Sequence, residues 1–310
     1  MASQPAPEIQ ALLDEMDDQG VLPFHAHSVD GARQYLEELF TSDTEPTPVG
    51  RVRDVLADGP AGDLPVRVYE PDDGEGPYPG LVWFHGGGFV LGNLDSVDPG
   101  CRALCNTTGR TVVSVNYRHA PEHPFPAAPE DCYAATEWAI EHSDALNIDP
   151  DRVAVGGPSA GGALAAAVPL LARDRGSPDI ERQVLVYPVT NYVREFESYE
   201  ENGEGYFLTK ADMDWFNNHY LDRAVDARNP YAYPLEARDL SGLPPATVLT
   251  AGFDPLRDEG IAYAERLADA GVDTAHHHYE EMIHGFFSLL EDPEIERAWD
   301  AIEQVAADLG

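Results

Sequence analysis

The chain is poor in positive charge and above all in lysine. Its 310 residues include 56 Asp and Glu against 19 Lys and Arg, which gives a formal net charge of -37, and Lys210 is its one lysine. Nucleic acids and anionic membranes both require a basic surface, so this shortage argues against either as a partner. An acidic patch that recruits a basic partner is the alternative, but the acids are spread along the whole chain.

The acidic excess does not indicate disorder, because the hydrophobic fraction of 43% is that of an ordinary globular protein. At ordinary salt such like charge pushes a compact state apart, whereas at 1 M salt the Debye length is about 3 Å and the repulsion is mostly screened. Nearly all the basic residues are arginine. The composition therefore predicts a halophilic protein.

Cysteine pairs and long apolar runs are also missing. Cys101, Cys105 and Cys132 are an odd number without metal-site spacing, so we expect buried, unreactive thiols rather than disulfides or a zinc site. The N-terminus has no positive start followed by an apolar segment, and no later run reaches the roughly 18 apolar residues of a membrane span. We expect a cytoplasmic protein without a membrane partner.

Short apolar runs alternate with helical patterns along most of the chain, which predicts an α/β fold with a mostly parallel sheet covered on both faces. Two stretches depart from the alternation, residues 1–45 and 190–235, and we expect them to form a lid with an apolar entrance over the carboxyl edge of the sheet. The expected strands are residues 65–69, 80–85, 111–116, 152–156, 183–188 and 246–252, the expected helices are 97–108, 130–142, 160–174, 256–270 and 294–308, and the lid aromatics are Tyr206, Phe207, Trp215, Phe216 and Tyr220.

Ser159 is the candidate nucleophile. It lies between Gly157 and Gly161, directly after an expected strand and before an alanine-rich helix. That strand-turn-helix context is the one a nucleophile elbow needs, and the glycines suit a tight, strained turn. The plain alternative is a glycine-rich bend without chemistry.

A triple glycine follows His85 at the end of the expected strand 80–85. Glycines there let the backbone fold so that its N–H groups converge on one point, as in an oxyanion hole. A merely flexible loop would explain glycine but not three glycines directly after a histidine.

A serine hydroxyl needs a base and an acid that orients the base. Asp254 follows an expected strand and His284 follows the run "TAHHHYEEMI", so both should lie at the carboxyl edge, and the order Ser, Asp, His is that of α/β-hydrolases. Asp254 could equally be a helix N-cap if His284 is left out of account. Asp258 and Glu259 compete for the acid role but should lie inside the helix.

Neither a metal nor a nucleotide cofactor is indicated. His276, His277 and His278 are consecutive, so on a strand they alternate between faces and cannot converge on one ion. H-E-x-x-H is absent, and Lys210 follows threonine rather than glycine, which excludes a Walker A loop.

Together these motifs resemble the hormone-sensitive-lipase-like carboxylesterases over residues 80–290. The resemblance implies an α/β-hydrolase fold with an eight-stranded sheet, a core of residues 46–189 and 236–310, a helical cap of residues 1–45 and 190–235, and short- to medium-chain esters as substrates. Ser159 would attack the ester, His284 would carry the proton, Asp254 would hold the imidazole, and the N–H groups of Gly87, Gly88 and Ala160 would form the oxyanion hole. The motifs are "HGGGF" at 85–89, "YRHAPEHPFPAAPED" at 117–131, "GGPSAGG" at 156–162, "DPLRDEG" at 254–260 and "HGF" at 284–286.

Two positions depart from that family, which usually has aspartate where this chain has Pro158 and leucine where it has His119. Proline favours an extended residue before it, so the elbow can still form, but a carboxylate and a backbone N–H are lost. We expect reduced but real activity. Two other functions stay open: a small-molecule receptor of the same fold, against which the presence of His284 counts, and an amide or formamide hydrolase. A homodimer through an edge strand is also left open.

Overall fold

The computed structural model describes residues 2–40, 45–72, 74–192 and 195–310. Within them, eight strands form one sheet in the order β1-β2-β4-β3-β5-β6-β7-β8. The pairs β1/β2 and β2/β4 are antiparallel, and the other neighbours are parallel. The strands are β1 (Arg51–Gly59), β2 (Gly62–Glu70), β3 (Tyr78–Phe84), β4 (Thr111–Val115), β5 (Ile148–Pro158), β6 (Gln183–Val186), β7 (Ala246–Phe253) and β8 (Thr274–Ile283).

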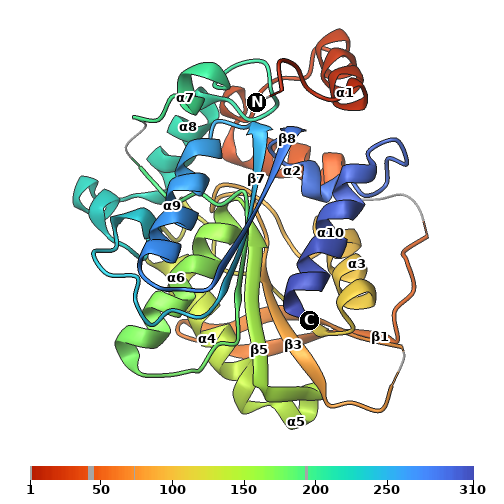
Figure 1. Cartoon of the computed structure of the whole chain (residues 1–310), viewed down its shortest axis with the longest axis vertical. Coiled ribbons are helices and arrows are strands. Elements are labelled where there is room, and N and C mark those ends of the chain that lie inside the picture. Colours follow the sequence, from red (N-terminus) through yellow and green to blue (C-terminus); the bar gives the residue numbers. More distant parts are fainter. Residues whose placement is uncertain (1, 41–44, 73, 193–194) are drawn as a thin grey trace.

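Helices cover both faces of this sheet. Helices α3 and α10 lie on one face, whereas α4, α6 and α9 lie on the other (Figure 1). Every residue of β4 and β7 is buried between these layers, which explains their continuous apolar and β-branched runs. The α-helices are α1 (Pro7–Asp18), α2 (Val29–Phe40), α3 (Asp98–Thr108), α4 (Ala127–Glu141), α5 (Ser143–Leu146), α6 (Ala160–Arg175), α7 (Ser198–Glu201), α8 (Lys210–Tyr220), α9 (Arg257–Asp269) and α10 (Glu296–Leu309).

The α/β-hydrolase fold expected from the sequence is confirmed, and so are the six strands and five helices placed there, within a few residues at their ends. Strand β1 was not expected. It is an edge strand whose residues are mostly exposed or half-buried, so it lacks the apolar signal of the central strands.

Two distant segments meet over the carboxyl edge of the sheet. The short helix η1 (Phe24–Ala26) packs against α8, and α2 lies near the upper ends of β7 and β8 (Figure 1). The backbone N–H and Nδ1 of His25 both lie 2.8 Å from the Asp212 carboxylate. Parts of the two stretches expected to form a lid are thus in contact with each other, and residues 41–44 and 193–194 of these stretches lie outside the described residues.

The helices and the three cysteines can be described directly. Among the described residues, no helix has the length and apolar character needed to cross a membrane. Cys101, Cys105 and Cys132 are buried free thiols. Burial raises the pKa of Cys101 and of Cys105 to about 12, so these two thiols are poorly reactive at neutral pH.

Candidate active site

Ser159 occupies a sharp turn between β5 and α6. Its φ of 58° and ψ of -119° lie outside the regions that non-glycine residues usually adopt. The neighbouring glycines allow this turn because the backbone approaches very closely: a Cβ would lie 1.9 Å from the Phe84 carbonyl oxygen on Gly161 and 2.3 Å from it on Gly157. The G-x-S-x-G spacing is therefore a steric requirement of the elbow.

The structure also shows why proline is tolerated before the nucleophile. The N–H groups of Val155 and Ser159 donate to carbonyls on the β6 side, at Arg182 and Val186. The nitrogen of Pro158 therefore faces the β3 side, where the pairing of β3 with β5 ends at Gly156. The proline therefore leaves the pairing of β5 with β6 intact, which continues through Pro158.

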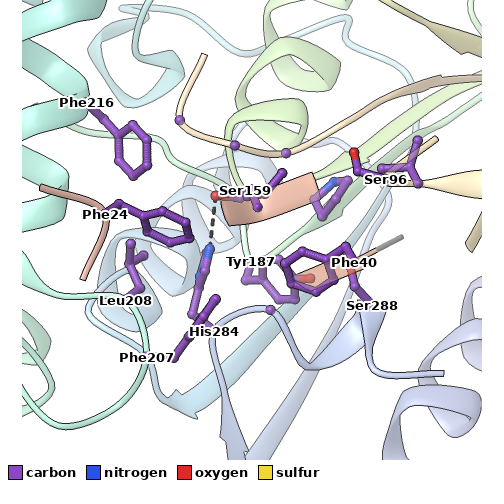
Figure 2. Close-up of a pocket in the computed structure, with 17 residues that line it drawn as sticks. Phe24, Phe40, Ser96, Ser159, Tyr187, Phe207, Leu208, Phe216, His284 and Ser288 are labelled. Atoms are coloured by element: carbon purple, nitrogen blue, oxygen red, sulfur yellow. Dashed lines mark hydrogen bonds between the residues drawn. The ribbon is translucent and has the colours of Figure 1, made fainter. Parts of the chain in front are cut away.

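His284 links Ser159 to Asp254. Its Nε2 lies 3.0 Å from Ser159 Oγ, and its Nδ1 lies 2.8 Å from Asp254 Oδ2 (Figure 2). A carboxylate can only accept a hydrogen bond, so Nδ1 carries the proton and Nε2 presents its lone pair to the serine hydroxyl. Asp254 is fully buried and also accepts from the Leu256 N–H at 2.8 Å.

The two competing acids have other partners. Asp258 pairs with Arg257 and accepts from the Ser198 N–H. Glu259 is fully buried. It accepts hydrogen bonds from the N–H groups of Thr190 and Asn191 and from the Tyr199 hydroxyl. Burial outweighs these donors and raises the pKa of Glu259 to about 8. Among the three acids, the geometry favours Asp254 as the partner of His284.

The glycine loop lines the same pocket as His284. Gly87 and Gly88 line the same pocket as Ser159 and have φ values of 108° and 60°, which suit glycine. Ala160 is the first residue of α6, so its N–H is one of the helix N-terminal donors without an intrahelical acceptor. Gly87 and Gly88 thus share the pocket of Ser159, and Ala160 directly follows the serine in the chain.

The His85 side chain forms a hydrogen bond with the glycine loop. Its Nδ1 lies 2.7 Å from the Gly86 carbonyl oxygen, which must accept, so Nδ1 is protonated and Nε2 is an acceptor. His119 Nε2 lies 3.3 Å from that acceptor and therefore carries its own proton. The Tyr117 hydroxyl donates to the His85 carbonyl at 2.8 Å, and its ring stacks on the His85 ring.

The pocket around Ser159 has a volume of about 90 Å³ and an apolar wall. In Figure 2, Phe24, Leu208 and Phe216 lie on one side of the hydrogen bond between Ser159 and His284, and Ser96, Phe40, Tyr187 and Ser288 lie on the other. Of the lid aromatics predicted from sequence, Phe207 and Phe216 line it. The lining residues that the sequence did not reveal include Phe24, Leu36, Phe40, Ser96, Val97, Tyr187 and Ser288.

The three consecutive histidines belong to β8 and do not converge. His276 Nε2 and His278 Nδ1 each lie 2.9 Å from Thr250 Oγ1, whereas His277 Nε2 lies 2.9 Å from a carboxylate oxygen of Asp308. The alternation of faces predicted from sequence is confirmed. In the described part of the chain, no group of three or more His, Cys, Asp or Glu side chains is arranged to hold a metal ion.

A family model described as the α/β-hydrolase fold matches residues 81–288. The matched range includes Ser159, Asp254, His284 and the glycine loop. This chain belongs to the α/β-hydrolase family. Carboxylic ester hydrolase LipN of Mycobacterium tuberculosis is 48% identical over 77% of the chain, and the match spans 65% of LipN, slightly less than two thirds of its length. Esterase LipI of the same organism is 41% identical over 90% of the chain and 88% of LipI.

Solved structures of the family agree closely with the fold. An ester hydrolase from the metagenome of Lake Arreo, complexed with a bipyridine phosphonate derivative, has a TM-score of 0.92 at 41% identity and covers 99% of this chain and 98% of its own. An esterase of Pyrobaculum calidifontis has a TM-score of 0.89 at 40% identity, with 98% of each chain covered. The ester hydrolase class expected from the sequence is confirmed by these relatives.

Proposed function

We propose that the protein is a serine carboxylesterase that works through an acyl-enzyme intermediate. One observation carries the proposal. The hydrogen-bonded chain from Ser159 through His284 to Asp254 opens into an apolar pocket bordered by Gly87 and Gly88. A nucleophile, a base, an orienting acid and oxyanion donors are the parts that acyl transfer from an ester requires.

In the first half-reaction, Ser159 Oγ attacks the ester carbonyl carbon while His284 Nε2 takes the hydroxyl proton. The carbonyl oxygen becomes negative and accepts hydrogen bonds from the N–H groups of Gly87, Gly88 and Ala160. The intermediate collapses, the carbon–oxygen bond to the alcohol breaks, and His284 gives its proton to the departing alkoxide. Asp254 stabilises the imidazolium in between.

In the second half-reaction, water replaces the alcohol. His284 Nε2 removes a proton from the water as its oxygen attacks the acyl carbon. Collapse of this intermediate breaks the bond to Ser159 Oγ, which recovers its proton from His284 and releases the carboxylic acid. Both half-reactions use only the side chains named here, backbone N–H groups and water.

The apolar wall and the small volume of the pocket support short- to medium-chain esters as substrates. Residues 1–45 and 190–235 would act as the cap over this pocket, because Phe24, Phe40, Phe207 and Phe216 all come from those stretches. Residues 46–189 and 236–310 would form the catalytic core.

We extend the proposal to the setting of the enzyme. The net charge of -37 and the near absence of lysine support adaptation to high salt, and a cytoplasmic location remains part of the same proposal. Strand β8 forms one edge of the sheet and is a candidate interface for a homodimer. Size-exclusion chromatography with light scattering in 2 M KCl tests that assembly.

The test of function is hydrolysis of p-nitrophenyl butyrate by the purified protein in high salt, with Ser159→Ala as the control. Turnover that disappears in the control is expected. The matching anilide and an aryl formamide distinguish an esterase from an amide or formamide hydrolase. Salt-stable folding and ligand binding without any turnover would reject the proposal in favour of a receptor.

A further inference from the structure

We propose that a second apolar cavity next to the active-site pocket is a subsite for the hydrocarbon chain of longer esters, and that Phe24 and Phe207 form a gate between the two. The proposal rests on the ester hydrolase function proposed above. It adds a binding site that the catalytic residues do not use and predicts how chain-length preference is set.

The two cavities share one wall. The outer cavity has a volume of about 170 Å³, against about 90 Å³ for the pocket at Ser159. The residues common to both linings are Phe24 and Phe207. Their rings meet edge to face, with centroids 5.8 Å apart and an interplanar angle of 78°. Removing either ring would therefore join the two cavities.

The outer cavity suits a hydrocarbon chain. It lies among α1, the segment that leads to η1, α2 and the segment before α8, and most of its lining is apolar. Leu22 lies at its margin and is 55% exposed, so apolar surface continues toward solvent. An alkyl chain that leaves water for such a cavity gains hydrophobic free energy. The apolar residues that line only this cavity include Leu13, Met16, Val21 and Leu22.

The gate is asymmetric, because Phe24 is held in place. It is buried and contacts the ring of Phe216 at a centroid distance of 5.8 Å. The next residue, His25, is fixed to Asp212 through both its backbone N–H and its ring. Phe24 therefore forms the fixed side of the opening.

Phe207 forms the mobile side of the opening, because its side chain can rotate. It is half-buried and belongs to the irregular segment between α7 and α8. Its φ of 68° lies in the left-handed region, where a bulky residue is strained, and such strain is often found at functional sites. A Cβ on Gly285 would lie 3.4 Å from its ring, so the ring covers the residue next to His284. Rotation of this ring would open the pocket to the outer cavity.

The experiment measures kcat/KM along two ester series in high salt, at concentrations below micelle formation. One series is the p-nitrophenyl esters from acetate to dodecanoate, which vary the acyl chain. The other is the n-alkyl acetates from ethyl to dodecyl, followed by acid release, which vary the alcohol chain. The proteins are the wild type, Phe207→Ala and Leu22→Trp.

The quantity compared is the ratio of kcat/KM for ten-carbon chains to kcat/KM for four-carbon chains. Phe207→Ala should raise this ratio at least tenfold. Leu22→Trp should lower it, because the larger side chain fills the outer cavity. Leu22→Trp combined with Phe207→Ala should cancel most of the gain. Leu56→Trp, on the exposed part of β1 far from the site, is the matched control and should leave the ratio unchanged.

A shift in the acyl series places the acid chain in the outer cavity, and a shift in the alcohol series places the alcohol chain there. Either result supports the subsite. If Phe207→Ala keeps the circular dichroism and melting temperature of the wild type but the ratio moves in neither series, the gate is refuted. Failure of the proposed function would look different, because the wild type itself would not hydrolyse p-nitrophenyl butyrate.

Discussion

Two buried imidazoles next to the oxyanion loop are the most unusual residue-scale feature of the site. Burial lowers the pKa of His85 to about 4, and burial together with the neighbouring His85 lowers the pKa of His119 to about 3. Arg33 and His123 lower the pKa of His119 further, and Glu122 partly opposes them. Both rings are therefore neutral at pH 7, which the hydrogen bond from His119 Nε2 to His85 Nε2 requires.

This pair predicts an acid-sensitive fold. In the unfolded chain both rings accept protons below a pH of about 6.5, whereas in the folded state they resist protonation. Stability is then fully present above pH 6.5 and is lost as the pH falls toward 4. For His85 alone the loss is about 3 kcal/mol.

His119→Leu should weaken this dependence, although it leaves the His85 acceptor unpaired and destabilises the protein by about 1 kcal/mol at pH 7.5. Urea unfolding at pH 7.5, 6.0 and 5.0 in fixed high salt measures both effects. The stabilities of the variant and the wild type should converge as the pH falls. A constant difference at the three pH values would show that the pair does not titrate in this way.

Pro158 is a second residue-scale departure. The sheet tolerates it, but the chain lacks the carboxylate that the family has beside its nucleophile. Pro158→Asp should raise kcat/KM for p-nitrophenyl butyrate severalfold, because a carboxylate there would hydrogen-bond nearby groups and hold the elbow. Pro158→Ala restores the N–H without the carboxylate and serves as the control. Equal or lower activity of Pro158→Asp would show that this position does not limit catalysis.

At the scale of elements, α7 and the residue after it form hydrogen bonds with the loop that carries Asp254. Asn202, which is 3% exposed, donates through Nδ2 to the carbonyl oxygens of Gly252 and Asp254, each at 3.1 Å. The Ser198 hydroxyl donates to the Pro255 carbonyl at 2.8 Å. Ser198 and Asn202 thus supply hydrogen-bond donors to three carbonyl oxygens at the end of β7 and in the turn from β7 to α9.

Asn202→Asp should therefore lower kcat at least tenfold while KM changes less than twofold. The substitution keeps the shape of the side chain but places a carboxylate against two carbonyl oxygens. Leaving a buried polar group unsatisfied costs about 1–3 kcal/mol, which as a rise of the activation barrier corresponds to roughly five- to 150-fold in rate. Steady-state kinetics with p-nitrophenyl butyrate measures the split.

Asn217→Asp is the matched control, because Asn217 is also buried and lies on α8, and the variant keeps the oxygen that accepts from Tyr233. Its kcat should stay near that of the wild type. Equal losses of kcat in the two variants would indicate general damage to the fold and contradict a positioning role for Asn202.

The sequence was informative wherever one element determines a residue's position. Buried strands such as β4 and β7 have continuous apolar runs, and Ser159, Asp254 and the glycine loop each follow the carboxyl end of a strand. Phe24 and Phe40 could not be assigned to the pocket in that way. Their place depends on packing between segments far apart in the chain, such as the contact of His25 with Asp212 across 187 positions. Local patterns do not encode such contacts.

At the scale of the whole molecule, charge dominates. With 56 acidic and 19 basic residues, ion pairs can neutralise only a minority of the carboxylates. Self-repulsion then opposes folding at low ionic strength and weakens as salt shortens the Debye length.

The melting temperature should therefore rise with KCl, steeply up to about 1 M, where the Debye length has fallen to about 3 Å. Sucrose at matched osmolality is the control, because it is excluded from the protein surface but does not screen charge. Calorimetry or circular dichroism follows the transition. A melting temperature that is flat or falls between 0.1 and 2 M KCl would contradict halophilic adaptation.

The central claim is that Ser159 forms the covalent intermediate. The most direct measurement is intact-protein and peptide mass spectrometry after treatment with a p-nitrophenyl alkylphosphonate in 2 M KCl, which releases p-nitrophenol and leaves a stable phosphonyl ester on the attacked oxygen. We predict one adduct per chain, on Ser159, with loss of ester hydrolysis in step with labelling and no adduct in Ser159→Ala. Full ester hydrolysis by a chain whose Ser159 remains unlabelled, or labelling of another residue in step with inactivation, would contradict the account.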